Sequence, residues 1–316
     1  MEFITDMLPQ PPKAWKRAVF LALAFWFVRE YTFRFREKKL SGDVALITGG
    51  AGGIGRLMAL ALAKEGVTVV IWDMDEAAAA KVAQEIVAMG GKSASYKVNV
   101  TDRHYVYACA REVLERFGHV DILINNAGIV SGKKLFEADD ARSELTIAVN
   151  TTALLWTTKA FLPKMMERKH GHVVTIASSA GRVGLSGMTD YSASKFGAVG
   201  FAESLRNELR HTCPEIKTTM VCPGYIATGM FKGAQMRSTL PLLDPIVTRL
   251  MPVLEPEYVA SKIVTAVKRN QTILVMPKFG YSVWLFRALL PTDLLDLAMD
   301  LLGVSRSMEK FEQTRA

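Results

Sequence analysis

Tyr191 and Lys195 stand four residues apart in the stretch TDYSASKFG, residues 189–197. A spacing of four places two side chains on one face of a helix, one turn apart. A tyrosine has an ordinary pKa of about 10 and is a poor base at neutral pH, but a nearby ammonium group favours the phenolate and lowers that pKa. The pair therefore predicts a general acid/base, although an amphipathic helix with a half-buried tyrosine and a solvated lysine has the same spacing.

A glycine-rich loop, TGGAGGIGR at residues 48–56, lies between an apolar run and an apolar helical pattern. Gly49, Gly53 and Gly55 permit a tight turn and close approach of the backbone to a pyrophosphate, and the N-terminus of the following helix offers free N–H groups. Asp73 comes 18 residues after Gly55. An acid at that place accepts hydrogen bonds from the adenosine ribose and repels a 2′-phosphate, so NAD is favoured over NADP. Arg56 is expected to face solvent.

Six short apolar runs predict buried strands. They are VALIT (44–48), VTVVIW (67–72), DILIN (121–125), HVVTIAS (172–178), KTTMVC (217–222) and TILVMP (272–277). Helical patterns alternate with them, and two of these patterns end in glycine, as a helix C-terminus often does. This alternation predicts βαβ units in an α/β fold, namely a Rossmann-type doubly wound parallel sheet in a single domain of residues 41–278.

The composition is that of a globular protein, with 316 residues, 50% of them hydrophobic. Cys109, Cys213 and Cys222 form no CxxC pair, which indicates reduced thiols facing the cytosol. The five histidines are scattered, and neither His170 nor His172 has a Cys or carboxylate neighbour at ligand spacing in the sequence, so no metal site is expected.

Residues 1–40 are expected to form an N-terminal membrane anchor. Residues 1–39 hold eight Lys/Arg against four acids, so half of the net charge of +8 lies there. The basic groups flank AVFLALAFWFV (18–28), which is short for a bilayer span but suits an interfacial apolar segment between cations. A packed N-terminal helix is the alternative. Nucleic acid is not an expected partner, because no nucleic-acid module follows.

Residues 279–316 form a C-terminal extension, apolar over residues 279–304 and interrupted at Pro291. It is expected to be helical, and it either caps the fold or presents a second surface to a membrane or partner.

The quoted motifs resemble those of the short-chain dehydrogenases/reductases. TGGAGGIG matches the TGxxxGxG loop of that family, and four further blocks follow in the family's order over roughly residues 42–278. These blocks are NNAG (125–128), Asn150 in TIAVN, Ser178 with YSASK (191–195), and PGYIAT (223–228). Asn150 is expected to lie in the helix that follows NNAG. Asn99 stands where the family often has an aspartate.

The resemblance implies an NAD-dependent enzyme that transfers a hydride between an alcohol and the nicotinamide. Tyr191 would be the general acid/base, Lys195 would assist it and hold the nicotinamide ribose, Ser178 would bind the substrate oxygen, and Asn150 would support a proton relay. Ser179 is a neighbouring alternative to Ser178, but strand alternation would turn it the other way. The implied cofactor-binding residues are Thr48, Gly49, Gly53, Ile54, Gly55, Asp73, Asn99, Val100, Asn126, Ala127, Gly128, Tyr191, Lys195, Pro223, Gly224, Ile226 and Thr228.

Phrases such as SGKKLFEADD, WTTKAFLPKMM and DYSASKFGAVGFAESL look like the membrane-associated branch of retinol dehydrogenases and 17-beta-hydroxysteroid dehydrogenases. That resemblance implies a lipophilic alcohol as substrate, a homodimer through helices around 141–169 and 190–211, and a place on the endoplasmic reticulum membrane or a lipid droplet with the catalytic domain facing the cytosol. Apolar residues of the expected substrate loops agree with such a substrate. They are Val183, Leu185, Met188, Tyr225, Met230, Phe231, Met236, Leu240, Leu242, Leu243, Ile246, Leu250 and Met251.

Two other functions fit the same motifs. One is an NADPH-type reductase of a long-chain lipid ketone, against which Asp73 argues. The other is a weakly active membrane or lipid-droplet scaffold that binds a dinucleotide, against which the intact set of Ser178, Tyr191 and Lys195 argues.

Overall fold

A computed structural model of the protein describes residues 37–231 and 238–308. The chain divides into two units, residues 1–38 and 39–316, and all the elements below belong to the second. The anchor expected at residues 18–28 lies outside the described residues. Within the described ranges, no helix is both long and apolar enough to cross a bilayer.

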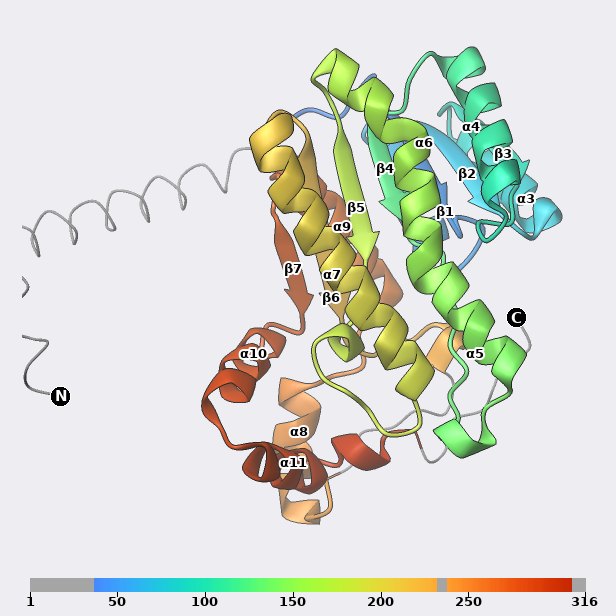
Figure 1. Ribbon diagram of the computed structural model, residues 1–316. Helices are drawn as coiled ribbons and strands as arrows, with labels where there is room; N and C mark the ends of the chain where they lie inside the picture. The colour runs from blue at the N-terminus through green and yellow to red at the C-terminus, as the bar shows by residue number, and fades with distance from the viewer. Residues whose placement is uncertain (1–36, 232–237, 309–316) are drawn as a thin grey trace, which may run out of the picture. The chain divides into compact units, whose positions relative to one another are not determined.

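The core is a sheet of seven parallel strands (Figure 1). The strands are β1 (Val44–Thr48), β2 (Thr68–Asp73), β3 (Ser93–Lys97), β4 (Ile122–Asn125), β5 (His172–Ile176), β6 (Lys217–Pro223) and β7 (Ile273–Met276). Their order is β3-β2-β1-β4-β5-β6-β7, so the chain winds outward in both directions from β1 and β4. The predicted doubly wound fold is confirmed.

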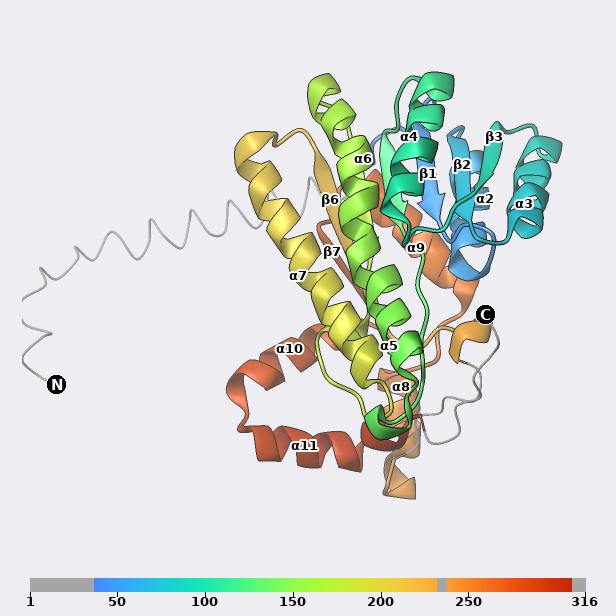
Figure 2. The same ribbon diagram turned by 45° about the vertical axis from the view of Figure 1, so that its right-hand side comes forward.

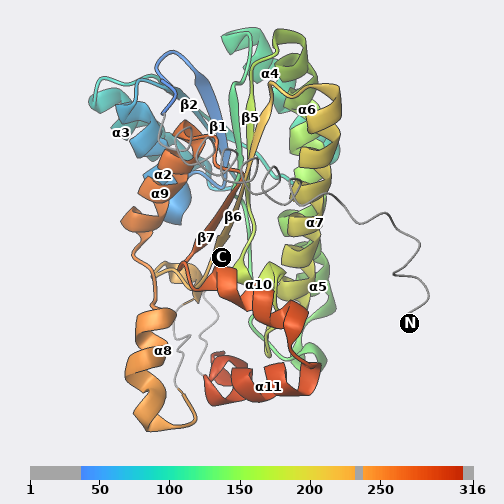
Figure 3. The same ribbon diagram turned by 90° about the vertical axis from the view of Figure 1, so that its left-hand side faces the viewer.

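Helices cover both faces of the sheet (Figures 1 and 3). On one face α2 (Gly53–Lys64), α3 (Glu76–Ala88) and α9 (Pro256–Lys268) share an apolar cluster with the strands, and on the other α4 (Arg103–Phe117), α6 (Ala153–Arg168) and α7 (Thr189–Thr212) do so. Successive side chains of β1 point to opposite faces of the sheet. Ala45 and Ile47 therefore belong to the first cluster, and Val44 and Leu46 belong to the second. This explains why the strand sequences are apolar throughout.

The strand β3 is not among the six predicted runs. Its sequence is SASYK, and only Ala94 is buried. This strand lies at the edge of the sheet and pairs only with β2, so its side chains need not all be apolar. The pattern of continuous burial that reveals the inner strands is therefore missing here.

The remaining elements surround the carboxyl ends of the strands (Figures 1 and 2). They are α5 (Asp140–Ile147), the π-helical turn η2 (Ala148–Thr152), α8 (Asp244–Leu250), α10 (Gly280–Leu289), α11 (Thr292–Leu301) and the short 3-10 turns η1 (Leu135–Glu137), η3 (Ser179–Gly181), η4 (Gly229–Phe231), η5 (Pro241–Leu243) and η6 (Val304–Arg306). The predicted break at Pro291 is confirmed, since α10 ends just before it and α11 just after it. Leu289 and Leu297 on these two helices are 70% and 54% exposed, so their outer faces are not covered by the described chain.

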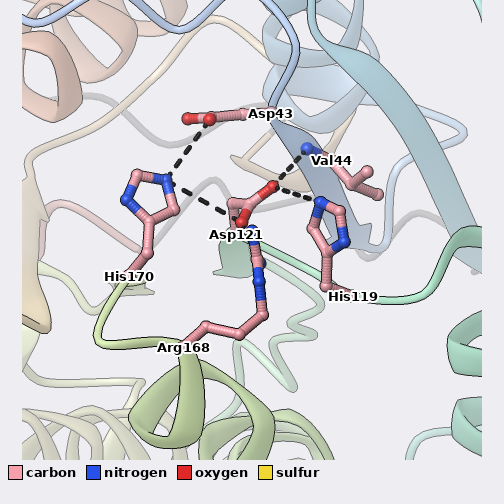
Figure 4. A network of polar contacts seen from close by, with 6 residues as sticks. All are labelled: Asp43, Val44, His119, Asp121, Arg168 and His170. Carbon is pink, nitrogen blue, oxygen red and sulfur yellow. Dashed lines mark hydrogen bonds and ion pairs between the residues drawn. The ribbon is translucent and has the colours of Figure 1, made fainter.

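A polar clamp joins β1, β4 and the end of α6 at the opposite end of the sheet, away from the carboxyl ends of the strands (Figure 4). Asp121 is 2% exposed, and its carboxylate accepts from the Val44 N–H at 2.9 Å and from Arg168 Nη1 at 2.5 Å. His119 Nε2 lies 3.1 Å from the same carboxylate. A buried carboxylate needs such partners, because an uncompensated charge in the interior is costly.

His170 also belongs to this clamp, with its Nε2 3.3 Å from Asp43 Oδ1 and 3.8 Å from Asp121 Oδ1. Sequence spacing gave no sign of these neighbours, because Asp43 is 127 positions from His170. Asp43, Asp121 and His170 offer oxygen and nitrogen atoms within 4.8 Å of one another, as a metal site would. The Arg168 guanidinium already balances the negative charge of Asp121. We therefore assign a structural role to the cluster of Asp43, Asp121 and His170.

Replacing Asp121 by alanine should lower the free energy of unfolding by about 2–4 kcal/mol, because it leaves the Val44 N–H without its acceptor and Arg168 without its anion. Urea unfolding of the two proteins measures this difference. The matched control is Glu167→Ala, which removes an exposed ion pair with Lys164 and should cost about 0.5 kcal/mol or less. Equal losses for the two variants would contradict the clamp.

Candidate active site

A cleft with a volume of about 660 Å³ lies at the carboxyl ends of the strands. This is where ligands bind in doubly wound sheets, because the loops after β1 and β4 run to opposite sides of the sheet. The sequence-predicted residues that line it are Gly49, Gly53, Ile54, Asp73, Asn99, Val100, Asn126, Ala127, Gly128, Ser178, Tyr191, Lys195, Pro223, Gly224, Ile226 and Thr228. Thr48, Gly55 and Asn150 do not line the cleft and act behind it.

The glycine loop fits closely against the loop after β4. A Cβ atom on Gly55 would lie 2.2 Å from the Gly49 carbonyl oxygen, and Gly49 has a positive φ of 61°. Asn126 Nδ2 donates to the carbonyl oxygens of Thr48 and Gly49 at 3.0 and 2.9 Å. Thr48 Oγ1 in turn accepts from the Asn126 and Ala127 N–H groups. These bonds fix the loop so that the N-terminus of α2 can receive a pyrophosphate.

Asp73 is held at the adenosine side of the cleft. Its Oδ2 accepts from the Ala51 N–H at 2.9 Å and its Oδ1 from the Asp75 N–H at 3.1 Å. Arg56 turns to Glu85 and bonds it through Nε at 3.1 Å and Nη2 at 2.5 Å. Its side chain does not line the cleft and is 39% exposed, close to the solvent-facing position that the sequence predicted.

Asn99 reaches the cleft but also stabilises its own turn. Its Oδ1 accepts from the Thr101 N–H at 3.1 Å and from Thr101 Oγ1 at 2.8 Å. An asparagine can therefore stand where the family often has an aspartate, because these bonds need only an acceptor oxygen.

Ser178, Tyr191 and Lys195 meet at the inner end of the cleft, with exposures of 8%, 4% and 4%. Tyr191 and Lys195 lie one turn apart on α7, as predicted, and Lys195 Nζ is 5.7 Å from the centre of the tyrosine ring. Ser178 Oγ accepts from the Ala180 N–H at 3.1 Å, so its proton is left to donate. Ser179 lines a different cavity, which agrees with the expectation that it points away.

Burial controls the protonation of this group. It raises the pKa of the Tyr191 phenol well above its ordinary value, while the hydrogen bond from Ser178 acts in the lowering direction and does not compensate for burial. Burial also lowers the pKa of Lys195 to about 8. The protein by itself thus does not lower the phenol's pKa, in contrast to the expectation that the nearby Lys195 ammonium would do so.

Lys195 donates a hydrogen bond from Nζ to the Ile176 carbonyl oxygen at 2.9 Å. A Cβ atom on Gly128 would lie 3.6 Å from that Nζ and 3.3 Å from Asn150 Oδ1. The NNAG loop therefore passes close to both side chains.

Asn150 connects three parts of the site from behind. It lies in the π-helical turn η2 between α5 and α6, not inside a regular helix as predicted. Its Oδ1 accepts from the Ile129 N–H, and its Nδ2 donates to the Ile129 carbonyl oxygen and to Ser194 Oγ, each at 2.9 Å. A π-turn is a frequent feature of functional sites. Here it points an amide inward to the loop after β4.

Asp190 and Ser194 support the site and were not singled out from the sequence. Asp190 is 8% exposed and accepts from Ser131 Oγ at 2.6 Å and Ser143 Oγ at 3.2 Å, so it ties the start of α7 to the loop after β4 and to α5. Ser194 donates to the Tyr191 carbonyl oxygen at 2.7 Å. The only sign of such a role in the sequence was that both are small polar residues within three positions of Tyr191.

The predicted substrate loops divide into three groups. Met230 and Phe231 line the cleft, and Phe231 packs edge-on against the Tyr191 ring at 5.8 Å between centres. Four others, Val183, Leu185, Tyr225 and Met251, line a second cavity. Leu240, Leu242 and Ile246 are exposed, and Met236 lies outside the described residues.

The glycine loop, Asp73 at the end of β2 and the buried tyrosine–lysine pair define a dinucleotide-dependent oxidoreductase site. The sequence model of the short chain dehydrogenase family matches residues 43–238. Retinol dehydrogenase 10-B of Danio rerio is 38% identical over 92% of this chain and 89% of its own length, and epidermal retinol dehydrogenase 2 of Mus musculus is 41% identical over 87% of each.

Solved structures show the same relationship. A short chain dehydrogenase/reductase from Burkholderia phymatum in complex with NAD has a TM-score of 0.70 and 26% identity, covering 83% of this chain and 96% of its own. A metagenomic short-chain oxidoreductase in complex with NADP has a TM-score of 0.61 and 30% identity, covering 75% and 96%. The protein belongs to the short chain dehydrogenase family, in the branch similar to retinol dehydrogenases, and is an oxidoreductase acting on CH–OH groups with a fold that binds NAD or NADP.

The buried lysine predicts a pH dependence of stability. Because the pKa of Lys195 is about 8 in the folded state and the ordinary value for a lysine is 10.5, the unfolded chain binds more protons between these values. The free energy of unfolding therefore gains up to about 1.4 kcal/mol per pH unit from this group as pH rises from 8 towards 10. Urea unfolding at pH 8 and 9.5 should show this gain in the wild type and not in Lys195→Met. An equal gain in both proteins would contradict burial of the amine, and Lys97→Met, on the exposed edge strand, is the control.

Proposed function

We propose that the protein is an NAD-dependent oxidoreductase that interconverts a lipophilic alcohol, similar to retinol or a hydroxysteroid, and its carbonyl. The observation that carries this proposal is the Tyr191 phenol, buried between Ser178 and Lys195 at the inner end of a cleft with an apolar side. The similarity to proteins named retinol dehydrogenases supports the substrate class.

A nicotinamide dinucleotide, when bound, supplies the hydride acceptor for alcohol oxidation. The residues that would hold it are the glycine loop, Asp73, the NNAG loop and the segment 223–228, which together line one cleft. A Cβ atom on Gly55 would collide with the Gly49 carbonyl oxygen, and one on Gly49 with the Ala127 backbone, so the main chain here is open to a group that needs close approach.

Tyr191 takes the proton from the substrate hydroxyl in this proposal. Ser178 donates a hydrogen bond to the substrate oxygen, which takes the place of the one that it makes to the Tyr191 hydroxyl. Lys195 places positive charge beside the phenol, and Asn150 positions the Ile129 segment and, through Ser194, the first turn of α7. Asn150 has three hydrogen bonds to protein groups, so its structural role stands beside the proton relay that the resemblance implied.

The charge at the adenosine side supports NAD over NADP. Asp73 presents its carboxylate to the cleft, where it would repel a 2′-phosphate, and Arg56 is held by Glu85 instead of facing the cleft. The solved relatives include one complex with NAD and one with NADP, so the choice rests on these residues.

Asp73→Asn should raise the ratio of kcat/KM for NADP to that for NAD about 10- to 100-fold, because the repulsion of the 2′-phosphate and one strong ribose acceptor are both lost. Steady-state kinetics with each cofactor measures the ratio. Arg56→Gln is the matched control and should leave the ratio unchanged. A ratio that stays the same in Asp73→Asn would show that another residue selects the cofactor.

Tyr191→Phe should lower kcat with retinol or estradiol by about 10²–10⁴-fold, because the proton acceptor is removed while the ring still fills its place. Tyr258→Phe, at a tyrosine that is 48% exposed on α9, is the control and should keep full activity. Wild-type turnover by the Tyr191 variant would end the proposed acid/base role. Equal binding of NAD by both variants, measured by calorimetry, would exclude a folding defect.

The protein is further proposed to act as a homodimer at the endoplasmic reticulum membrane or a lipid droplet, with an anchor at 1–40, a catalytic domain at 41–278 and an extension at 279–316. Exposed apolar side chains on α5, α6 and α7, which lie on one face of the sheet (Figure 2), support dimerisation there. They are Leu145, Ile147, Leu155 and Phe196.

Exposed leucines on α10 and α11 and the basic apolar segment around residues 18–28 support a lipid surface. Membrane fractionation and sedimentation of the detergent-solubilised protein test these two points.

A further inference from the structure

A second cavity is lined by residues from the ends of β6 and β7 and from α10 and α11. Figure 3 shows these two helices beyond the ends of the two strands. Its volume is about 90 Å³, and its wall is mainly apolar. Val183, Met251, Val275, Val283 and Met299 are among the lining residues. Arg182 is the charged residue of the lining, and its guanidinium is ion-paired with Glu203 at 2.6 Å. The chemistry of this cavity is therefore that of a site for a hydrocarbon chain.

The cavity is separated from the catalytic tyrosine by a thin partition. Leu185 and Tyr225 line the cavity, and both also pack against the apolar cluster that contains Tyr191. Phe231 continues this partition, with its ring centre 5.4 Å from that of Tyr225 and 5.8 Å from that of Tyr191. A substrate oxygen bound at Tyr191 thus lies one layer of side chains from the cavity.

A C-terminal strap, residues 304–308, holds the partition in place. Val304, Ser307 and Met308 are 6%, 1% and 7% exposed. The Tyr225 hydroxyl and Ser307 Oγ form a hydrogen bond of 2.9 Å, and Met308 packs in the same cluster as Tyr191. Val304 also lines the cavity, so the strap contacts both sides of the partition.

We propose that this second cavity is a subsite for the far end of a long hydrocarbon chain of the substrate, and that the chain reaches it when the Tyr225 side chain leaves Ser307. The proposal rests on the proposed function, because it assigns the oxygen of the same substrate to Tyr191 and Ser178. A hydrocarbon subsite accounts for the presence of an apolar cavity beside the catalytic site. It also accounts for the single hydrogen bond, between Tyr225 and Ser307, that closes the partition. The partition can rotate at a side chain without unfolding a strand or helix.

Val283→Trp tests the subsite by filling it. The full chain, in one detergent, is assayed with NAD and unbranched primary alcohols from butanol to decanol. In the wild type, kcat/KM should rise with chain length by about fourfold for each methylene that is buried, until the chain reaches the end of the subsite. In Val283→Trp the rise should stop at a shorter chain, so that the ratio for decanol to butanol falls at least tenfold. Val87→Trp, at a residue that is 56% exposed on α3, is the matched control and should keep the wild-type ratio.

Tyr225→Phe provides an independent test of the partition, because it removes only the hydroxyl that bonds Ser307. The decanol-to-butanol ratio should rise about 2- to 10-fold, as expected for the loss of one hydrogen bond that keeps the partition closed. An unchanged ratio in Tyr225→Phe, together with an unchanged chain-length limit in a folded Val283→Trp, would overturn the subsite and leave the proposed function standing.

A binding measurement distinguishes failure of the subsite proposal from failure of the proposed function. Absence of turnover by the wild type with every alcohol and both cofactors would overturn the proposed function. Displacement of an apolar fluorescent dye by decanol would then still test the cavity. Weaker displacement in Val283→Trp than in the wild type and Val87→Trp would support a hydrocarbon site, and equal displacement in all three would overturn it.

Discussion

The parallel pairing of β1 with β4 is the constraint on which the site depends. These two neighbouring strands are followed by loops that run apart, since β2 and β3 extend the sheet on one side and β5, β6 and β7 on the other. The Thr48 hydroxyl and the Asn126 amide bond the two loops across this junction. The same junction thus supplies a crevice for a dinucleotide and fixes the distance from the glycine loop to the NNAG loop.

The chemistry at the inner end of the cleft depends on burial. Tyr191 and Lys195 are both shielded from water, which opposes the charged form of each. Neither side chain is therefore readily charged in the protein by itself, and we propose that a bound nicotinamide ring, positive in its oxidised form, would favour the phenolate of Tyr191. Packing of Phe231 against the phenol keeps the group dry. The surrounding backbone is held at the same time, because Asn150 Nδ2 donates to the Ile129 carbonyl oxygen and Asp190 Oδ1 accepts from the Tyr191 N–H.

The sequence allowed the sheet, the cleft and the central acid/base group to be predicted because each has a local signal. Inner strands are continuously apolar, the glycine loop is contiguous, and Tyr191 and Lys195 are one turn apart. The edge strand β3 lacked such a signal, since only Ala94 among its five residues is buried. The π-turn at Asn150 was read as regular helix, because one extra residue in a turn leaves no compositional mark. The Asp121 clamp and the second cavity could not be predicted, because they join residues 43 with 170 and 183 with 304.

The relation between the two cavities gives the C-terminal extension a role in the catalytic unit. Its helices α10 and α11 bound the cavity through Val283 and Met299, and its final turn is bonded to Tyr225, two residues after the Pro223 that lines the dinucleotide cleft. In the proposed function, the extension therefore shapes the substrate side of the site, and its outer leucines would face the proposed lipid surface.

The three cysteines, Cys109, Cys213 and Cys222, are free and buried, as the reduced thiols expected from the sequence should be. Burial raises the pKa of the Cys222 thiol to about 11, which keeps it protonated and unreactive at neutral pH. Thiol reagents are therefore expected not to modify the cysteines of the native protein. A cysteine introduced on the outer face of α11 would be the one site that takes a spin label or fluorophore, so a label there reports whether that helix enters a bilayer.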